Sequence, residues 1–166
     1  MKRLLIDVNV VFDALMERSP HSRDAAKLWF AVEAKQVEAL IPAHGVTMFF
    51  YLSARAKGTV FARRALGVVL GTFGVAAVDQ SVIQRAVALD GRDFEDSVCA
   101  AAAEASGCDA IVTRDPKGFP GCALPVLSAE TAVALLGGTP PDRVSDAPRR
   151  RRRPARPRTR RPAPAP

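Results

Sequence analysis

Short apolar runs alternate with stretches of helical spacing along most of the chain. Five apolar runs predict buried strands, at residues 3–8, 37–43, 75–79, 109–115 and 123–128. Apolar residues three and four positions apart predict helices, at residues 19–36, 45–58, 59–74, 80–91, 93–106 and 128–138. Strands that alternate with helices at this spacing predict a parallel sheet with helices on both faces. We therefore expect a three-layer α/β/α fold with a four- to five-stranded parallel sheet.

Acidic residues stand where this fold predicts a ligand site. Asp7 and Asp115 end predicted strands, and Asp93 and Asp96 begin the helix that precedes the strand ending at Asp115. Ligands of parallel sheets bind outside the carboxyl ends of the strands, and a helix antiparallel to the strands begins at that same edge. We therefore expect these four carboxylates to converge.

Several carboxylates in one pocket repel one another unless a cation lies among them. Oxygen ligands favour Mg²⁺ or Mn²⁺ over zinc. One such ion can polarise a water molecule, and a second, about 4 Å away, can stabilise the leaving oxygen of a phosphoryl displacement. The pattern therefore points to nuclease chemistry.

Ordinary structural roles stay open for the same acids. Asp93, with Asp96 three residues later, is also typical of a helix N-cap with its reciprocal partner. Asp115 precedes a proline, which is typical of a turn. Asp13 is expected on an exposed face of the first helical turns, and Glu95 at the surface. The joint placement of several acids on one predicted edge, rather than any single acid, favours the site.

The chain resembles the PIN domain family, in particular the VapC-like toxin ribonucleases of type II toxin–antitoxin systems. The resemblance covers roughly residues 2–137 and is carried by LLIDVNVVFDALMERSP, DFEDSVCAAAAEASGCDAIVTRDPKGF and LPVLSAE. It implies a metal-dependent endoribonuclease that hydrolyses RNA phosphodiester bonds with Mg²⁺ or Mn²⁺. It further implies an RNA substrate, a cognate antitoxin protein and a homodimer.

The same resemblance assigns roles to individual residues. Three acids match its catalytic and metal-binding positions, and these are Asp7, Asp96 and Asp115. Asp93 matches a further metal-binding acid found in part of the family. Asn9 and Thr113 match small polar residues that support the site through hydrogen bonds.

One region departs from the family pattern. Many PIN domains have a glutamate early in the second long helix, where this chain has about Met48, and no acid lies between Glu38 and Asp79. His44 and Thr47 lie close by. An alternative function is therefore a catalytically impaired PIN scaffold that binds RNA as a regulatory module. In the same helix, the apolar stretch 48–54 is expected to supply core residues and an antitoxin contact, with Phe50 or Tyr51 as the contacting residue.

The positive charge of the chain is concentrated at its end. Residues 144–166 hold nine arginines and one acid, Asp146, so this segment carries +8 and residues 1–143 carry −1 of the total +7. The segment is rich in proline and lacks apolar periodicity, which predicts a PIN-like domain at 1–138 and a disordered Arg/Pro-rich tail at 139–166. Such a tail suits RNA binding without sequence preference, or it is a dispensable extension.

Cysteine usage and hydropathy exclude other classes. The three cysteines, Cys99, Cys108 and Cys122, form no CxxC pair, which argues against a zinc knuckle or a disulfide framework. No apolar run approaches the roughly 20 residues that cross a bilayer. Asp7 and Asp13 interrupt the first apolar stretch, which makes it a poor signal peptide. We expect a cytoplasmic protein.

Overall fold

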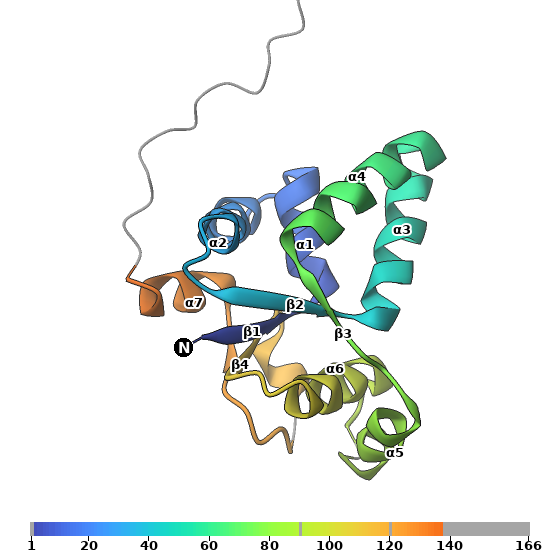
Figure 1. Ribbon diagram of the computed structural model, residues 1–166, viewed down its shortest axis with the longest axis vertical. Helices are drawn as coiled ribbons and strands as arrows, with labels where there is room; N and C mark the ends of the chain where they lie inside the picture. Colours follow the sequence, from blue (N-terminus) through green and yellow to red (C-terminus); the bar gives the residue numbers. More distant parts are fainter. Residues whose placement is uncertain (1, 90, 120, 138–166) are drawn as a thin grey trace, which may run out of the picture.

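A parallel sheet forms the centre of the computed structural model, which describes residues 2–89, 91–119 and 121–137. Its five strands are β1 (Arg3–Ile6), β2 (Glu38–Pro42), β3 (Gly74–Ala76), β4 (Ala110–Val112) and β5 (Val126–Leu127). They lie in the order β3-β2-β1-β4-β5, and every neighbouring pair is parallel. β1 is therefore the central strand (Figure 1). Asp7 directly follows β1, which places it at the middle of the carboxyl edge.

Seven α-helices flank the sheet in the described part of the chain. They are α1 (Val8–Met16), α2 (Ser22–Glu33), α3 (Ala43–Lys57), α4 (Thr59–Thr72), α5 (Gln80–Leu89), α6 (Phe94–Ala105) and α7 (Ala129–Leu135). A short 3-10 helix, η1, spans Pro116–Gly118. The predicted three-layer α/β/α fold is confirmed. The main difference is that the first strand ends at Ile6 and a full helix follows it, because Asp7 leaves the strand to cap α1.

Two apolar cores separate the three layers. Helices α1, α2, α3, α4 and α7 cover one face of the sheet, and α5 and α6 cover the other (Figure 1). Alternation along β1 supplies both cores, since Leu4 and Ile6 face the first group of helices and Leu5 faces the second. The buried face of α6 includes four consecutive alanines, residues 100–103. Their small side chains allow α6 to lie close to the sheet, so its first turn is held near the carboxyl edge.

The apolar stretch 48–54 on α3 contains both core and exposed residues. Phe49 is fully buried, Leu52 packs against the same core, and Tyr51 is 58% exposed. No helix within the described ranges has the length and hydropathy needed to cross a membrane. The predicted tail at 139–166 lies outside the described residues.

Candidate functional site

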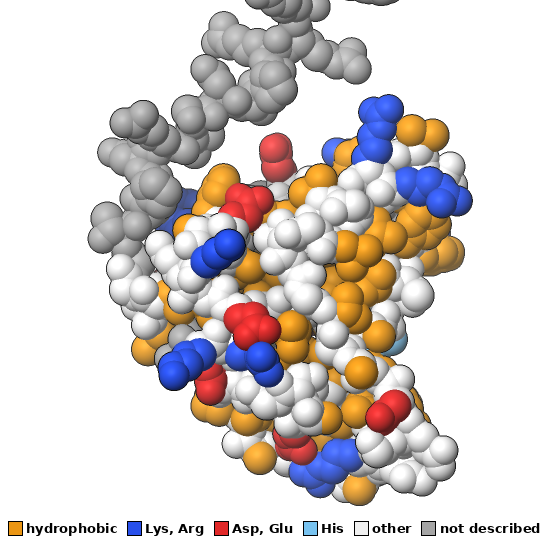
Figure 2. Space-filling view, viewed as in Figure 1, with side chains coloured by type: hydrophobic (Ala, Val, Ile, Leu, Met, Phe, Trp, Pro, Cys, Tyr) orange, Lys and Arg blue, Asp and Glu red, His pale blue; other side chains and the backbone are white. Residues whose placement is uncertain are grey.

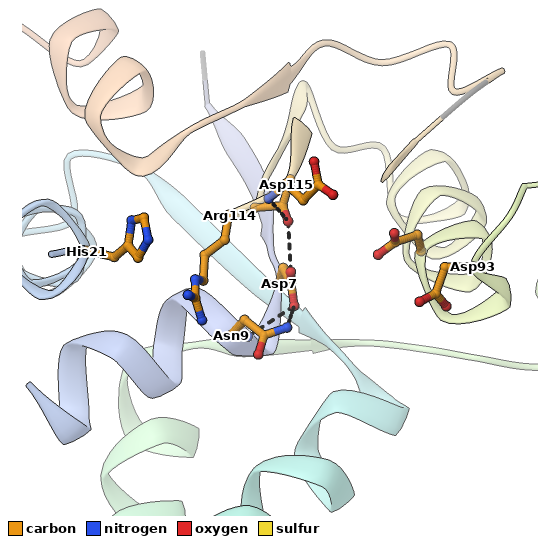
Figure 3. A pocket seen from close by; sticks show the side chains of 8 residues that line it. Asp7, Asn9, His21, Asp93, Arg114 and Asp115 are labelled. Atoms are coloured by element: carbon orange, nitrogen blue, oxygen red, sulfur yellow. Dashed lines mark hydrogen bonds between the residues drawn. The ribbon is translucent and has the colours of Figure 1, made fainter. Parts of the chain in front are cut away.

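The carboxyl edge of the sheet carries a pocket of about 410 Å³, which we call the acidic pocket (Figure 3). All six residues expected at a site line it, and these are Asp7, Asn9, Asp93, Asp96, Thr113 and Asp115. His21 and Arg114 also line it and were not expected from the sequence. The predicted edge therefore brings together side chains from four separate segments of the chain.

Asp7 is held in one orientation by neighbouring donors. As the N-cap of α1, its Oδ1 accepts a hydrogen bond from the Asn9 backbone N–H at 3.0 Å and lies 3.4 Å from the Asn9 Nδ2 donor. The Thr113 hydroxyl donates to Asp7 Oδ2 at 2.8 Å. Asp7 is only 7% exposed. These bonds compensate for the burial of its charge and fix the carboxylate at the base of the pocket.

The start of α6 supplies two further carboxylates. Asp93 is the N-cap and accepts the Glu95 backbone N–H at 2.8 Å, so the predicted cap is confirmed. Asp96 lies in the first turn and reaches towards η1. A Cβ atom on Gly118 would overlap Asp96 Oδ2 and lie 3.9 Å from Asp115 Oδ2. A glycine at this position therefore leaves room for the Asp96 carboxylate beside the segment that carries Asp115.

Asp115 joins the same hydrogen-bond chain as Asp7. Its backbone N–H donates to the Thr113 hydroxyl oxygen at 3.3 Å, and that hydroxyl donates to Asp7. The Asp115 side chain also accepts the Lys117 backbone N–H at 3.1 Å and caps η1. The turn role expected for an Asp-Pro pair is therefore present together with a place in the pocket.

The acids of the pocket disfavour one another's charge. The pKa of Asp96 is raised to about 6, first by burial and then by the charges of Asp93, Asp7, Glu95 and Asp115. The pKa of Glu95 is also raised, by burial and then by Asp7 and Asp93. Glu95 was expected at the surface, but its side chain is only 37% exposed. A pocket with this concentration of negative charge gains stability when a cation enters it.

Comparison with known proteins identifies the family. A family profile described as PIN domain matches residues 3–117. This chain belongs to the PIN domain family. A search of curated proteins found no match.

Solved structures share the fold of this PIN domain. FitAcB from Neisseria gonorrhoeae is 18% identical with a TM-score of 0.62, over 76% of this chain and 97% of that one. A toxin–antitoxin complex from Klebsiella pneumoniae is 23% identical with a TM-score of 0.58, over 76% and 97% of the two chains. VapC20 from Mycobacterium tuberculosis, a sarcin–ricin loop cleaving toxin, is 19% identical with a TM-score of 0.57, over 71% and 97%.

The region without an acid contributes nothing to the lining of the pocket. Met48 packs against the core beneath α3. His44 lies in the first turn of α3, with its Nε2 3.6 Å from Cys99 Sγ and 3.8 Å from Glu95 Oε1. Burial lowers the pKa of His44, and the charge of Asp7 opposes that shift. In this PIN domain the carboxylate beside the first turn of α3 is therefore that of Glu95, which belongs to α6.

Asp13 contradicts the expectation of an exposed residue, because its side chain is completely buried. The helix α1 ends at Met16, and its C-cap Glu17 has a left-handed backbone (φ 52°) that turns the chain out of the helix. Arg18 Nε then lies 3.7 Å from Asp13 Oδ1, and Arg114 Nε lies 3.2 Å from Oδ2. Two guanidinium groups therefore balance the buried charge, which an apolar environment alone would not tolerate.

The oxygen atoms that line the acidic pocket are suitable ligands for a hydrated hard cation such as Mg²⁺. They are carboxylate, amide and hydroxyl oxygens, which suit Mg²⁺ or Mn²⁺. Among residues 2–89, 91–119 and 121–137, no three His, Cys, Asp or Glu side chains are grouped closely enough to hold a metal ion by themselves. Mg²⁺ usually takes only one or two protein carboxylates and completes its shell with water and substrate phosphate.

Proposed function

We propose that this PIN domain is a Mg²⁺- or Mn²⁺-dependent endoribonuclease that acts as the toxin of a toxin–antitoxin pair. The observation that carries the proposal is the meeting of Asp7, Asp96 and Asp115 in one pocket at the carboxyl edge of the sheet. Family membership supports nuclease chemistry. The shared fold with a toxin–antitoxin complex and with an RNA-cleaving toxin supports the biological role.

The roles of the site residues follow from their contacts. Asp7, Asp96 and Asp115 would hold the metal ion partly through its bound water molecules, and Asp93 would assist from the cap of α6. When bound, such an ion supplies an activated water and stabilises a leaving oxygen. Asn9 and Thr113 keep the Asp7 carboxylate in one orientation. With a pKa of about 6, Asp96 is mostly ionised at neutral pH and is then able to take part.

Cleavage of RNA with added Mn²⁺ tests the proposal. The wild type is compared with Asp7→Asn and Asp96→Asn, and we expect both variants to lose cleavage. Asp109→Asn is a matched control, because Asp109 accepts backbone N–H groups of Lys2 and Arg3 at the opposite edge of the sheet. It should cleave as the wild type does. Equal cleavage by the wild type and both site variants would refute the assignment.

An antitoxin partner and a homodimer are parts of the same proposal. Apolar side chains gather over α3 and α4 in Figure 2, and exposed ones on these helices include Tyr51, Val60, Val68 and Leu70. Such a surface suits a partner helix or a second copy. Co-expression with the product of an adjacent small reading frame should suppress toxicity, and light scattering of the purified protein should give twice the chain mass. The cytoplasmic location stays a prediction from the sequence.

A second candidate function is an RNA-binding module with an impaired site. It is favoured by Met48, which packs into the core where many relatives have an acid. It predicts that RNA affinity survives Asp7→Asn and Asp96→Asn but collapses when residues 144–166 are deleted. The affinity of the full chain should then fall steeply with salt, with a slope of about −0.7 per phosphate neutralised on single strands. Unchanged affinity after the deletion would exclude this candidate.

A further inference from the structure

Arg114 is the unexpected positive charge of the acidic pocket. Of the eight described residues that line the pocket, four are aspartates and Arg114 is the permanent cation. In Figure 3 its side chain lies between His21 and Asp7. It follows Thr113, whose hydroxyl bonds to Asp7, so its backbone is fixed directly beside the carboxylates.

Arg114 also belongs to a second pocket. This pocket, of about 320 Å³, lies between α1, α2 and the start of α7, and we call it the side pocket. The two pockets share His21, Thr113 and Arg114. A linear polymer that extends from the acidic pocket into the side pocket therefore passes the Arg114 side chain.

The buried carboxylate of Asp13 fixes that side chain. Arg114 Nε lies 3.2 Å from Asp13 Oδ2, and Asp13 is fully buried while the Arg114 side chain is 34% exposed. Within the described residues, neither Asp13 oxygen has a hydrogen bond of good geometry, so its ion pairs with Arg114 and Arg18 are its compensation. The contact with Arg114 uses Nε, and this leaves the two Nη groups of the guanidinium for another acceptor.

A phosphodiester is the acceptor that suits this position. The aspartates repel an RNA backbone, whereas a planar guanidinium offers paired donors that match phosphate oxygens. The side pocket is also lined by acids, of which Asp13 is paired with Arg18 and Arg114 and Asp24 is paired with Lys27 at 2.8 Å. Arg114 therefore marks the place near the carboxylates where an RNA phosphate is attracted.

We propose that Arg114 binds the RNA phosphate next to the one that is cleaved, and that Asp13 is the positioning residue that fixes the guanidinium. This inference rests on the proposed nuclease function. It adds a direct contact between Arg114 and the RNA at the boundary of the acidic and side pockets. It also explains the buried charge of Asp13 as the group that orients Arg114 for binding.

Variants of the 166-residue chain separate this role from a structural one. Arg114→Gln removes the guanidinium, and Arg18→Gln is the matched control, because Arg18 also contacts Asp13 but lines neither pocket. The first readout is the Kd for a fluorescein-labelled five-nucleotide RNA with 2′-O-methyl groups, which block cleavage. The second is the split between KM and kcat for the unmodified RNA with Mn²⁺.

The expected results are specific. Arg114→Gln should raise Kd and KM about tenfold, the loss of one charge-assisted hydrogen bond, and reduce the salt slope by about 0.7. Arg18→Gln should change neither quantity. Asp13→Asn keeps Arg114 but removes the charge that holds it, so Kd should rise while the salt slope stays as in the wild type. If Asp13→Asn does not fold, Arg114→Lys replaces it, because this variant keeps a positive charge beside Asp13. Arg114→Lys should have the salt slope of the wild type but a weaker affinity.

Other outcomes overturn the inference. Equal Kd and KM for Arg114→Gln and the wild type would show that no phosphate is bound there. Equal losses in Arg114→Gln and Arg18→Gln would assign the effect to the Asp13 ion pairs and the fold. Absence of cleavage by the wild type would instead refute the nuclease proposal, and the Kd comparison on the uncleavable RNA would still decide the role of Arg114.

Discussion

Asp96→Asn should stabilise the metal-free protein at neutral pH, although it destroys a proposed catalytic residue. The folded protein raises the pKa of Asp96 from 3.8 to about 6 through burial and neighbouring acids. A carboxyl group whose pKa rises on folding favours the folded state only while it is protonated. That contribution is complete below about pH 3.8 and is lost as the pH rises through 6. The amide never ionises, so the variant avoids the loss.

The size of the effect follows from the shift. A change of about two units corresponds to about 3 kcal/mol between the two protonation states. Asp96 is only partly buried, so solvent screening reduces this value, and the amide also gives up the favourable interaction of a negative charge with the start of α6. We expect the free energy of unfolding to rise by about 1 kcal/mol at pH 7.5, which raises Tm by about 4 °C for a domain of this size.

Urea unfolding in EDTA between pH 4.5 and pH 8 measures the effect. The difference between Asp96→Asn and the wild type should increase from pH 4.5 to pH 6 and level off above pH 7. Asp79→Asn is a control of opposite sign. Hydrogen bonds from the Ser81 hydroxyl and the Val82 N–H lower the pKa of Asp79 from its ordinary value of 3.8. Its stabilising effect is therefore present across this whole pH range and is lost only at lower pH, so Asp79→Asn should be less stable than the wild type by the same amount from pH 4.5 to pH 8. A pH-independent difference for Asp96→Asn, or its destabilisation at pH 7.5, would refute the electrostatic account of the pocket.

Three further predictions concern the same pocket. Gly118→Ala places a Cβ against Asp96, so the Mn²⁺ affinity measured by calorimetry should fall at least about tenfold. The control Gly67→Ala places its Cβ in open space on α4, so it should leave the Mn²⁺ affinity unchanged and raise the free energy of unfolding by about 0.5–1 kcal/mol. Thr113→Val removes the hydroxyl donor to Asp7 Oδ2 and should lower the free energy of unfolding in urea by about 2 kcal/mol, with Thr113→Ser restoring most of it. Mn²⁺ affinity should fall about tenfold per pH unit below pH 6, where Asp96 is protonated, and flatten above pH 7; a flat profile throughout would exclude Asp96 as a ligand.

The edge of the sheet that carries the site could be predicted because it depends on connectivity. Parallel strands joined by helices present their carboxyl ends at one edge, so Asp7 and Asp115 could be placed at the same edge once the alternation was recognised. That they lie close together depends on the strand order, in which β1 and β4 are neighbours. The cap at Asp93 could also be predicted, since it needs only residues within one turn. Helix α1 was harder to predict, because its apolar residues continue those of β1 and hide the change of period.

The missing parts of the prediction involve pairs of distant residues. Arg114 follows Thr113 in a segment that was assigned to a strand, and nothing local indicates that it reaches back to α1. The burial of Asp13 depends on the turn at Glu17 and on two arginines, one of which lies far along the chain. The half-buried position of Glu95 beside His44 depends in the same way on contacts between residues far apart in the sequence.

Patterns local to the sequence are sufficient to predict the alternation of strands and helices, the parallel sheet and the edge at which the acids collect. These features are decided by hydrophobic period, capping residues and chain connectivity, all of which act between neighbours in the sequence. The tertiary structure alone decided which charges meet. It buried Asp13 between Arg18 and Arg114 and turned Glu95 inwards. The reason is physical: the energy of a charge depends on its burial and on partners brought near by packing, and neither is encoded in local spacing.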